Sequence, residues 1–176
     1  ISFGSKTVFH EFDTNPISAI YDPSNNKVVI AYKGPSSDGY AVVGEVSGTS
    51  ISFGSPANFE TGHANYPSIV YDAVSGKNVI AYQSQTNSNQ GTAIVATVSG
   101  TSISFGSKVV FETGATYDIA MVYDETAQKT VIAYADDGDS YYGKFVLGTV
   151  SGSSISFSSP TVFNAANSPY IGIGYD

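Results

Sequence analysis

Cysteine, arginine and tryptophan are missing from this sequence of 176 residues. The lack of cysteine excludes a disulfide framework and any thiolate metal site. The lack of arginine leaves seven lysines to balance fifteen Asp and Glu, so the net charge is −8. Nucleic-acid binding depends on clustered lysine and arginine side chains that neutralise phosphates. We therefore expect no nucleic-acid partner.

Long hydrophobic runs are also missing. A membrane-spanning helix needs about 20 consecutive apolar residues, and no run approaches that length, so we expect no membrane insertion. Charged residues make up only 12% of the chain, about half the usual share. With few lysines and many small polar residues, this composition favours an extracellular, cell-surface or virion protein. The sequence opens at Ile1 within a motif, which suggests a processed chain or a segment.

What the sequence does contain is an internal repeat. The phrase ISFGS recurs, with ISFSS as its last version, and Tyr-Asp, Ala-Tyr and Val-Ser-Gly landmarks keep the same spacing. Periods of this length are the signature of repeat architectures. We predict a single repeat domain over 1–176, with repeats at 1–50, 51–102 and 103–154 and a partial repeat at 155–176.

Each repeat resolves into four strand-like segments. In the second repeat these are the alternating ISFGS segment at Ile51, a segment ending in Tyr71-Asp72, the apolar run NVIAY from Asn78, and AIVATV from Ala93. Gly48-Thr49 and its equivalents suit two-residue hairpins in which glycine supplies a positive φ. No segment has the periodicity of a useful amphipathic helix, so the chain is predicted to be all-β.

The apolar run indicates a β-propeller of four-stranded antiparallel blades, about 3.5 repeats in this chain. A strand that is apolar on both faces needs a sheet covered on both sides, and stacked blades provide that cover. Small residues line up in the Tyr-Asp strand, which places it innermost, followed outward by the VIAY, TVSG and ISFGS strands. A β-solenoid or β-sandwich is the alternative. The small residues are Ser18, Ser68, Ala120 and Gly172.

This strand order leaves the two ends of the sequence within incomplete blades. Uncovered apolar faces and open strand edges favour association. The expected partners are therefore further blades, either from the same longer chain or from identical chains in a homo-oligomer.

The pattern YDxxxxKxVIAY followed by TVSGTSISFGSxxVF resembles tandem repeats in uncharacterised propeller-like proteins of marine phages and bacteria. The resemblance covers essentially the whole chain. It implies a surface-exposed attachment or structural role and supplies no catalytic residues. The sequence departs from the pattern at Gly174, where other repeats have Ile or Val, and at Ser158, where they have Gly.

The function predicted from these features is a non-enzymatic surface module that binds glycan or protein, or that serves as a structural spacer. Every distinctive residue recurs, whereas a catalytic site needs singular ones. The alternative is a propeller-type glycoside hydrolase, in which two carboxylates with different roles act on the glycosidic bond. A sialidase is disfavoured, because such enzymes hold the substrate carboxylate with arginine.

The repeated Asp of the Tyr-Asp motif is predicted to be structural, as a hydrogen-bond acceptor that opens a turn. Lys27, Lys77 and Lys129 follow five residues later and are candidates to pair with it. His10 and His63 occupy different repeat positions, so they make a poor metal site and are interpreted as solvated loop residues. The turn aspartates are Asp22, Asp72, Asp124 and Asp176.

Two further groups are candidate binding residues. Asp136, Asp137 and Asp139 surround Gly138 in a pattern similar to calcium loops, although the distal Glu of an EF-hand is missing; no other cofactor is expected. Tyr66, Tyr117 and Tyr170 precede the innermost strand and could stack on sugars. The alternatives are a solvated loop for the aspartates and blade packing for the tyrosines.

Overall fold

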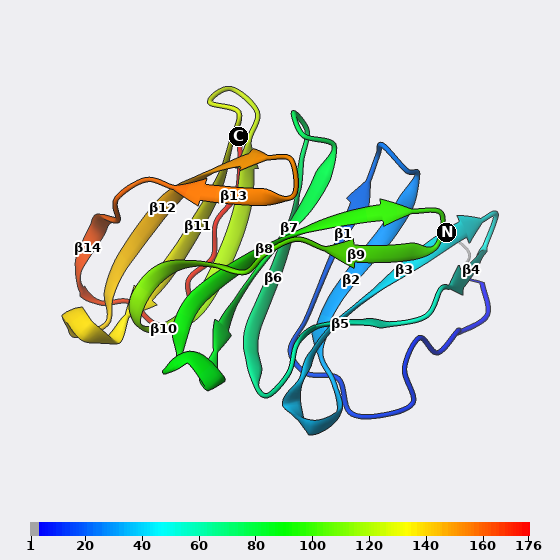
Figure 1. Ribbon diagram of the computed structural model, residues 1–176, viewed down its shortest axis with the longest axis horizontal. Coiled ribbons are helices and arrows are strands. Elements are labelled where there is room, and N and C mark those ends of the chain that lie inside the picture. The colour runs from blue at the N-terminus through cyan, green and yellow to red at the C-terminus, as the bar shows by residue number, and fades with distance from the viewer. Residues whose placement is uncertain (1–3) are drawn as a thin grey trace.

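A computed structural model describes residues 4–176, so the first ISFGS motif, which starts at Ile1, lies partly outside the described residues. The chain is all-β, with 61% strand and 5% helix, as predicted. The strands form two antiparallel sheets, one of which curls into a half-barrel (Figure 1). Within residues 4–176, no helix is long and apolar enough to span a membrane.

Three units with the same pattern of strands follow one another along the chain. Unit 1 contains β1 (Ile17–Asp22), β2 (Lys27–Lys33), β3 (Gly39–Ser47), β4 (Ser50–Phe53) and β5 (Ala57–Glu60). Unit 2 contains β6 (Ala64–Asp72), β7 (Lys77–Ser84), β8 (Gln90–Ser99), β9 (Ser102–Phe105) and the first part of β10 (Val109–Asp124). Unit 3 contains the rest of β10, β11 (Lys129–Asp136), β12 (Tyr142–Ser151), β13 (Ser154–Phe157) and β14 (Thr161–Asn167).

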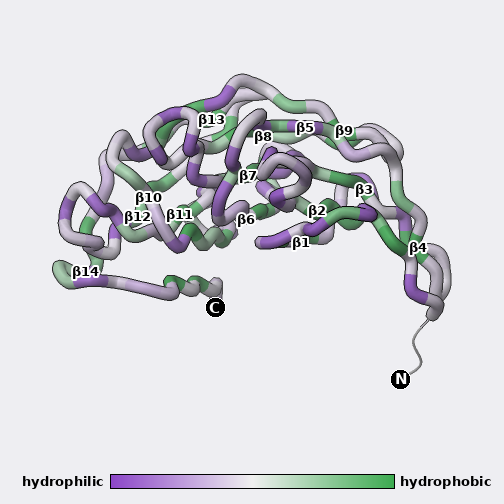
Figure 2. The backbone as a smooth tube through the Cα atoms, turned by 90° about the horizontal axis from the view of Figure 1, so that it is seen from below, coloured by the Kyte–Doolittle hydropathy of each residue, from purple (hydrophilic) through white to green (hydrophobic). Residues whose placement is uncertain are grey.

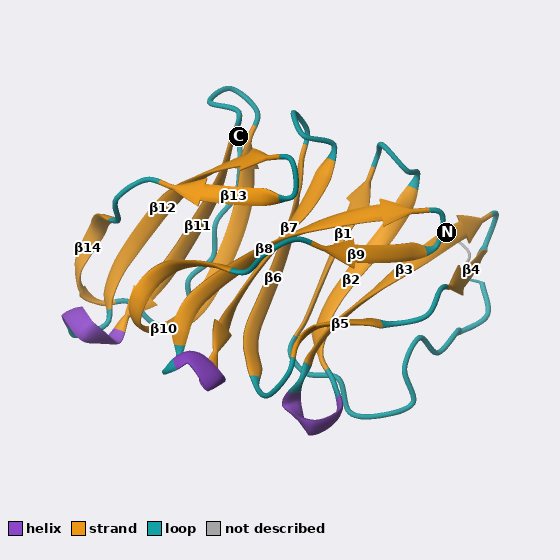
Figure 3. Cartoon of the chain, viewed as in Figure 1, coloured by secondary structure: helices purple, strands orange, loops and turns teal. Residues whose placement is uncertain are grey.

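Within every unit the strands pair in sequence order, from the Tyr-Asp strand to the ISFGS strand. The predicted order within a unit is therefore confirmed. A short 3-10 turn joins the second and third strands of each unit, and all three turns lie along one edge of the molecule (Figure 3). These turns are η1 (Pro35–Ser37), η2 (Gln85–Asn87) and η3 (Asp137–Asp139).

The outermost strand, predicted as one of four segments in each repeat, is broken into two pieces that both pair with the third strand. β4 and β5 both pair with β3, and β13 and β14 both pair with β12. The break falls at Gly54, where an added Cβ would lie 2.0 Å from the carbonyl oxygen of Thr101 in the next unit. A glycine at the break therefore lets the hairpin of the next unit pass close to the strand.

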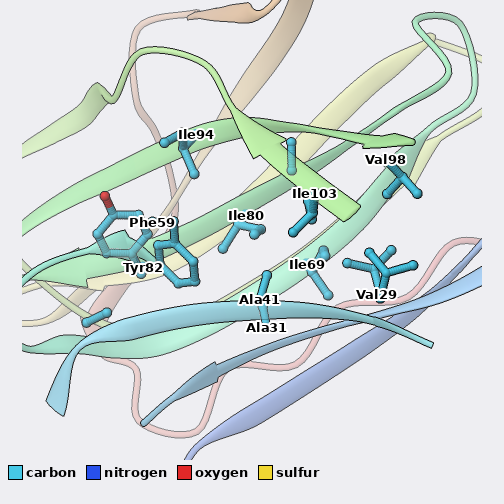
Figure 4. Packing of buried hydrophobic residues seen from close by; sticks show 13 residues of the cluster. Val29, Ala31, Ala41, Phe59, Ile69, Ile80, Tyr82, Ile94, Val98 and Ile103 are labelled. Atoms are coloured by element: carbon cyan, nitrogen blue, oxygen red, sulfur yellow. The ribbon is translucent and has the colours of Figure 1, made fainter. Parts of the chain in front are cut away.

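Side chains from adjacent units interdigitate between the sheets. We call the side of a unit that points to the next unit its front face and the opposite side its rear face. The front face of unit 1 packs on the rear face of unit 2 in one buried cluster (Figure 4). A second cluster joins units 2 and 3 in the same way. The front faces comprise Val29, Ala31, Ala41 and Val43 in unit 1 and Val79, Ala81, Ala93 and Val95 in unit 2; the rear faces comprise Ile80, Tyr82 and Ile94 in unit 2 and Ile132, Tyr134 and Val146 in unit 3.

This packing explains why the VIAY strand is apolar on both sides. Seven successive residues of β7, from Asn78 to Ser84, are buried, since both faces of the central unit are covered. Burial of apolar surface contributes about 25 cal/mol per Å². Most of the stability is therefore expected to reside between units, which agrees with a repeat protein.

The innermost strands of the three units lie side by side. β1 and β10 both contact β6, and the Oγ of Ser18 accepts a hydrogen bond from the Ile69 N–H at 3.3 Å. An open groove of about 500 Å³ runs along them, with Ser18 and Ser68 in its lining. Small side chains at these positions let the strands approach one another.

Residues 169–176 run along the inner side of unit 3 without forming a strand (Figure 2). Tyr175 hydrogen bonds Thr126 at 2.7 Å, as Tyr71 of unit 2 hydrogen bonds Ser24 of unit 1. This C-terminal segment therefore holds the place that an innermost strand takes in the other units.

Candidate binding site at the tyrosine bulges

The innermost strands bulge at the edge that carries the 3-10 turns. The β6–β7 register shifts between Asn65 and Ser68, and the β10–β11 register shifts between Tyr117 and Ala120. Tyr66 has a φ of 52° and Asp118 a φ of 51°, both left-handed. Bulges turn side chains away from the regular alternation, and non-glycine residues in this region store strain of the kind found at functional sites. The two bulges lie at equivalent repeat positions of units 2 and 3.

Tyr66 and Tyr117 lie together in one polar pocket of about 390 Å³. Their ring centroids are 6.1 Å apart and the rings are inclined at 67°. Burial raises the pKa of Tyr66, and the neighbouring Asp118 and Tyr117 raise it further. The hydroxyl therefore stays protonated at neutral pH and can donate a hydrogen bond.

A row of polar side chains forms the floor of this pocket. Lys33 donates to the Asn65 Oδ1 at 3.2 Å, and the Asn65 Nδ2 donates to the Gln83 Oε1 at 2.8 Å. Gln83 in turn donates to the Thr116 carbonyl at 2.6 Å and is buried. The row crosses three units, so the pocket exists only when the units are stacked.

A smaller pocket of about 190 Å³ lies on the other side of Tyr117. Tyr141 contributes a second ring, 5.6 Å from that of Tyr117. Asp118 is the one carboxylate among the described residues that line the two pockets, and its Oδ2 accepts the Tyr170 N–H at 3.2 Å. Tyr117 thus separates two adjoining pockets, each with a second aromatic ring.

The structure brings together two of the three tyrosines singled out from the sequence. Tyr170 is 93% exposed and lines neither pocket. Sequence reasoning missed Lys33, Asn65 and Gln83, because they occupy strand ends in two different units and no shared motif connects them. The signal that could have found Asp118 is its alignment with Tyr66 in the repeat.

Two of the three candidate calcium residues, Asp136 and Asp139, are bound to a lysine. The Lys144 ammonium donates to Asp136 at 2.6 Å and also to Asp139, while the other Asp136 oxygen accepts the Gly138 N–H at 2.9 Å. Burial lowers the Lys144 pKa, but hydrogen bonds to Asp136 and Asp139 outweigh it and the net shift is upward. Across residues 4–176, no group of three or more His, Cys, Asp or Glu side chains is placed to hold a metal ion. The ammonium takes the position between the carboxylates that a bound cation would need.

The turn aspartates accept local hydrogen bonds. Asp22, Asp72 and Asp124 each accept the backbone N–H three residues later, at 3.1, 2.8 and 2.8 Å. Asp22 also accepts from the Asn78 Nδ2 of the next unit at 2.8 Å, so it links two units. Asp176 lies at the exposed end of the chain.

The expected pairing of the turn lysines with these aspartates is wrong. Lys27 binds Glu45 at 3.0 Å, whereas Lys77 and Lys129 donate to Thr97 and Thr149, each at 2.8 Å. The physical reason is that the carboxylates already accept hydrogen bonds from the turn N–H groups, whereas each lysine side chain extends to the third strand of its unit.

We predict that Asp22→Asn lowers the free energy of unfolding by about 1–3 kcal/mol. Asp22 is fully buried and accepts from two amide NH₂ groups, Asn25 and Asn78. Both amides donate to Oδ2 and the Asn25 backbone N–H donates to Oδ1, so the NH₂ of an asparagine would face a donor in either orientation and leave it without an acceptor. Urea unfolding should measure this, with Asp124→Asn as the milder control; equal effects for both variants would contradict the prediction.

The histidines differ from the sequence interpretation in one respect. His63 is exposed, but His10 is half-buried, with its ring 5.3 Å from that of Tyr32. It packs on the rear face of unit 1, because that face has no preceding unit among the described residues.

No model of a known protein family matches the chain, and no curated protein is similar to it.

Proposed function

We propose that the three units are blades of a β-propeller and that the protein is a non-enzymatic surface module that binds saccharide at the tyrosine bulges. The repeated strand order, the stacking of front on rear faces and the side-by-side innermost strands support the propeller. The resemblance to repeats of marine phage and bacterial surface proteins supports an extracellular, cell-surface or virion location.

The observation that carries the binding proposal is the pair of pockets on either side of Tyr117. Saccharides present apolar C–H faces and many hydroxyl groups. Tyr66 and Tyr117 offer ring surface for the former, and the Asn65, Gln85 and Asn89 side chains in the same pocket offer donors and acceptors for the latter. Few, well-placed polar groups beside aromatic surface are typical of small-molecule sites.

The two pockets together suit a chain of sugars rather than one. Tyr117 is common to both, and the pockets hold about 390 and 190 Å³. One sugar would occupy the pocket lined by Tyr66 and Tyr117, and the next the pocket lined by Tyr117 and Tyr141. We therefore expect oligosaccharides to bind more tightly than the corresponding monosaccharides.

A glycan array with the purified full chain, followed by calorimetry with the best oligosaccharide, tests this proposal. Tyr117→Ala should weaken binding at least about tenfold, which corresponds to roughly 1.4 kcal/mol. Tyr21→Ala is the matched control, because Tyr21 is half-exposed at the opposite edge of the inner strands. Absence of binding across the array, or equal losses in both variants, would refute it.

The glycoside hydrolase alternative is tested in the same samples. Hydrolysis of a glycosidic bond uses two carboxyl groups on either side of the bond, and Asp118 alone lines the pockets among the described residues. We expect the array ligands to remain intact after long incubation. Release of reducing ends that disappears in Asp118→Asn would replace the binding module with an enzyme.

A further inference from the structure

The front face of unit 3 has no partner unit among residues 4–176. Alignment with the front faces of units 1 and 2 shows that this face comprises Val131, Ala133, Phe145 and Leu147. An apolar cavity of about 650 Å³ lies between it and the C-terminal segment. In the other two interfaces, the corresponding space is filled by Ile, Tyr and Val or Ile from the rear face of the next unit.

The exposure of Phe163 also shows that no unit covers the front face of unit 3. Its equivalents, Phe59 and Phe111, are 3% and 7% exposed because each packs on a tyrosine of the next unit. Phe163 itself is 53% exposed on β14. A rear-face tyrosine is therefore the group that this side of unit 3 lacks.

The rear face of unit 1 offers such a tyrosine. Ile30, Tyr32 and Val42 form a small cluster that Phe9 and Phe53 cover. Phe9 lies 5.3 Å from Tyr32, so it takes the position that Phe59 takes on Tyr82. Residues 4–16, which carry Phe9, form no strand.

We propose that the front face of unit 3 docks the rear face of unit 1 from a second copy of this chain. The interface continues the two internal ones, with Phe163 of one copy on Tyr32 of the other. The segments that give way are residues 4–14 and 170–176, which have no backbone pairing with a strand. In the docked pair, β13, β14 and β1 hold the same repeat positions. Two copies would supply six units, within the about 4–8 blades of propellers, so head-to-tail docking can close into a two-fold ring.

Two side chains weaken this docking relative to the internal interfaces. Ser158 stands where Gly54 and Gly106 pass a hairpin carbonyl of the next unit, and a Cβ at Gly106 would lie 1.7 Å from the Ser153 oxygen. Phe145 stands where the other front faces have Ala41 and Ala93. Both are larger than the internal pattern admits, so the incoming unit must shift. We therefore expect an association that depends on concentration.

Sedimentation velocity and light scattering on the full chain over micromolar to millimolar concentrations test the proposal. The mass should rise from 18.4 kDa toward twice that value. The double variant Phe145→Ala/Ser158→Gly, which restores the internal pattern, should raise the association constant at least about tenfold. Val131→Asp, which places a charge on the docking face, should keep the protein monomeric, with circular dichroism to confirm that it folds.

These variants distinguish specific docking from nonspecific hydrophobic association. Phe145→Ala removes apolar surface, so an interface held only by an exposed hydrophobic patch would weaken in the double variant. That result would overturn the proposal, as would a mass of 18.4 kDa at every concentration or growth into filaments. Glycan binding is measured separately and does not depend on this outcome, because both pockets form within one chain and their lining residues Pro16 and Pro169 lie outside the segments that give way.

Discussion

Above pH 10 the protein is expected to lose stability steeply. Tyr32, Tyr82 and Tyr134 are the largest fully buried side chains of the three units. Burial, with a smaller effect of Tyr40, raises the pKa of Tyr32 to about 12. Burial also raises the pKa of Tyr82 and Tyr134, and the nearby carboxylates of Glu60 and Glu112 raise them further.

The direction of this change in stability with pH follows from proton linkage. A tyrosine whose pKa is higher in the folded state loses its proton first in the unfolded chain, so rising pH favours unfolding. Each of the three contributes about 1.4 kcal/mol of destabilisation per pH unit between pH 10 and its folded pKa. Together they remove roughly 4 kcal/mol per unit, which is comparable to the whole stability of many domains. Alkaline unfolding followed by circular dichroism should show a midpoint below pH 12.

Phenylalanine variants isolate this cause. The Tyr32 hydroxyl has no hydrogen-bond partner among the described residues, and the Tyr82 hydroxyl lies near Glu60 without a bond of normal geometry. The variant Tyr32→Phe/Tyr82→Phe should therefore change stability little at pH 7 and raise the alkaline midpoint by at least about half a pH unit. Tyr21→Phe/Tyr170→Phe removes two exposed hydroxyls as a matched control. An unchanged midpoint in the buried pair would show that tyrosine ionisation is not the cause.

Lys144→Met is expected to lower the free energy of unfolding by about 3 kcal/mol. The variant keeps most of the side-chain volume but leaves Asp136, whose side chain is 5% exposed, without its counter-ion. Removing one partner of a buried pair costs more than removing both, since the remaining charge is uncompensated. For a chain of this length the melting temperature should fall by roughly 6–12 °C.

The double variant Lys144→Met/Asp136→Asn should recover most of that loss in the free energy of unfolding, and calorimetry would measure it.

Calcium provides a second test of the same loop. Millimolar Ca²⁺ should leave the melting temperature of the unaltered protein in place, because Lys144 occupies the space between Asp136 and Asp139. It should partly rescue Lys144→Met. A large calcium response of the unaltered protein would favour the calcium loop instead.

The period of the sequence determined the β class, the four strands per unit and their order. The VIAY strands predicted a sheet covered on both faces, and β7 is buried on both sides because units 1 and 3 flank it. The hairpin glycines also follow from local chemistry: Gly48, Gly100 and Gly152 have φ near 60°. These features depend on neighbours in sequence or on the alternation of faces, which a repeat displays several times.

The contacts between strands and between units could be determined only from the tertiary structure. These contacts include the break of the outer strand at Gly54, the hydrogen bonds of the turn lysines to the third strand, and the position of Lys144 between two aspartates. The candidate site has the same origin, since Lys33, Gln83 and Tyr117 come from three units and share no motif. Side chains that approach only after the sheets stack leave no trace in local periodicity, and for that reason sequence reasoning found Tyr66 and Tyr117 but not the amide row beneath them.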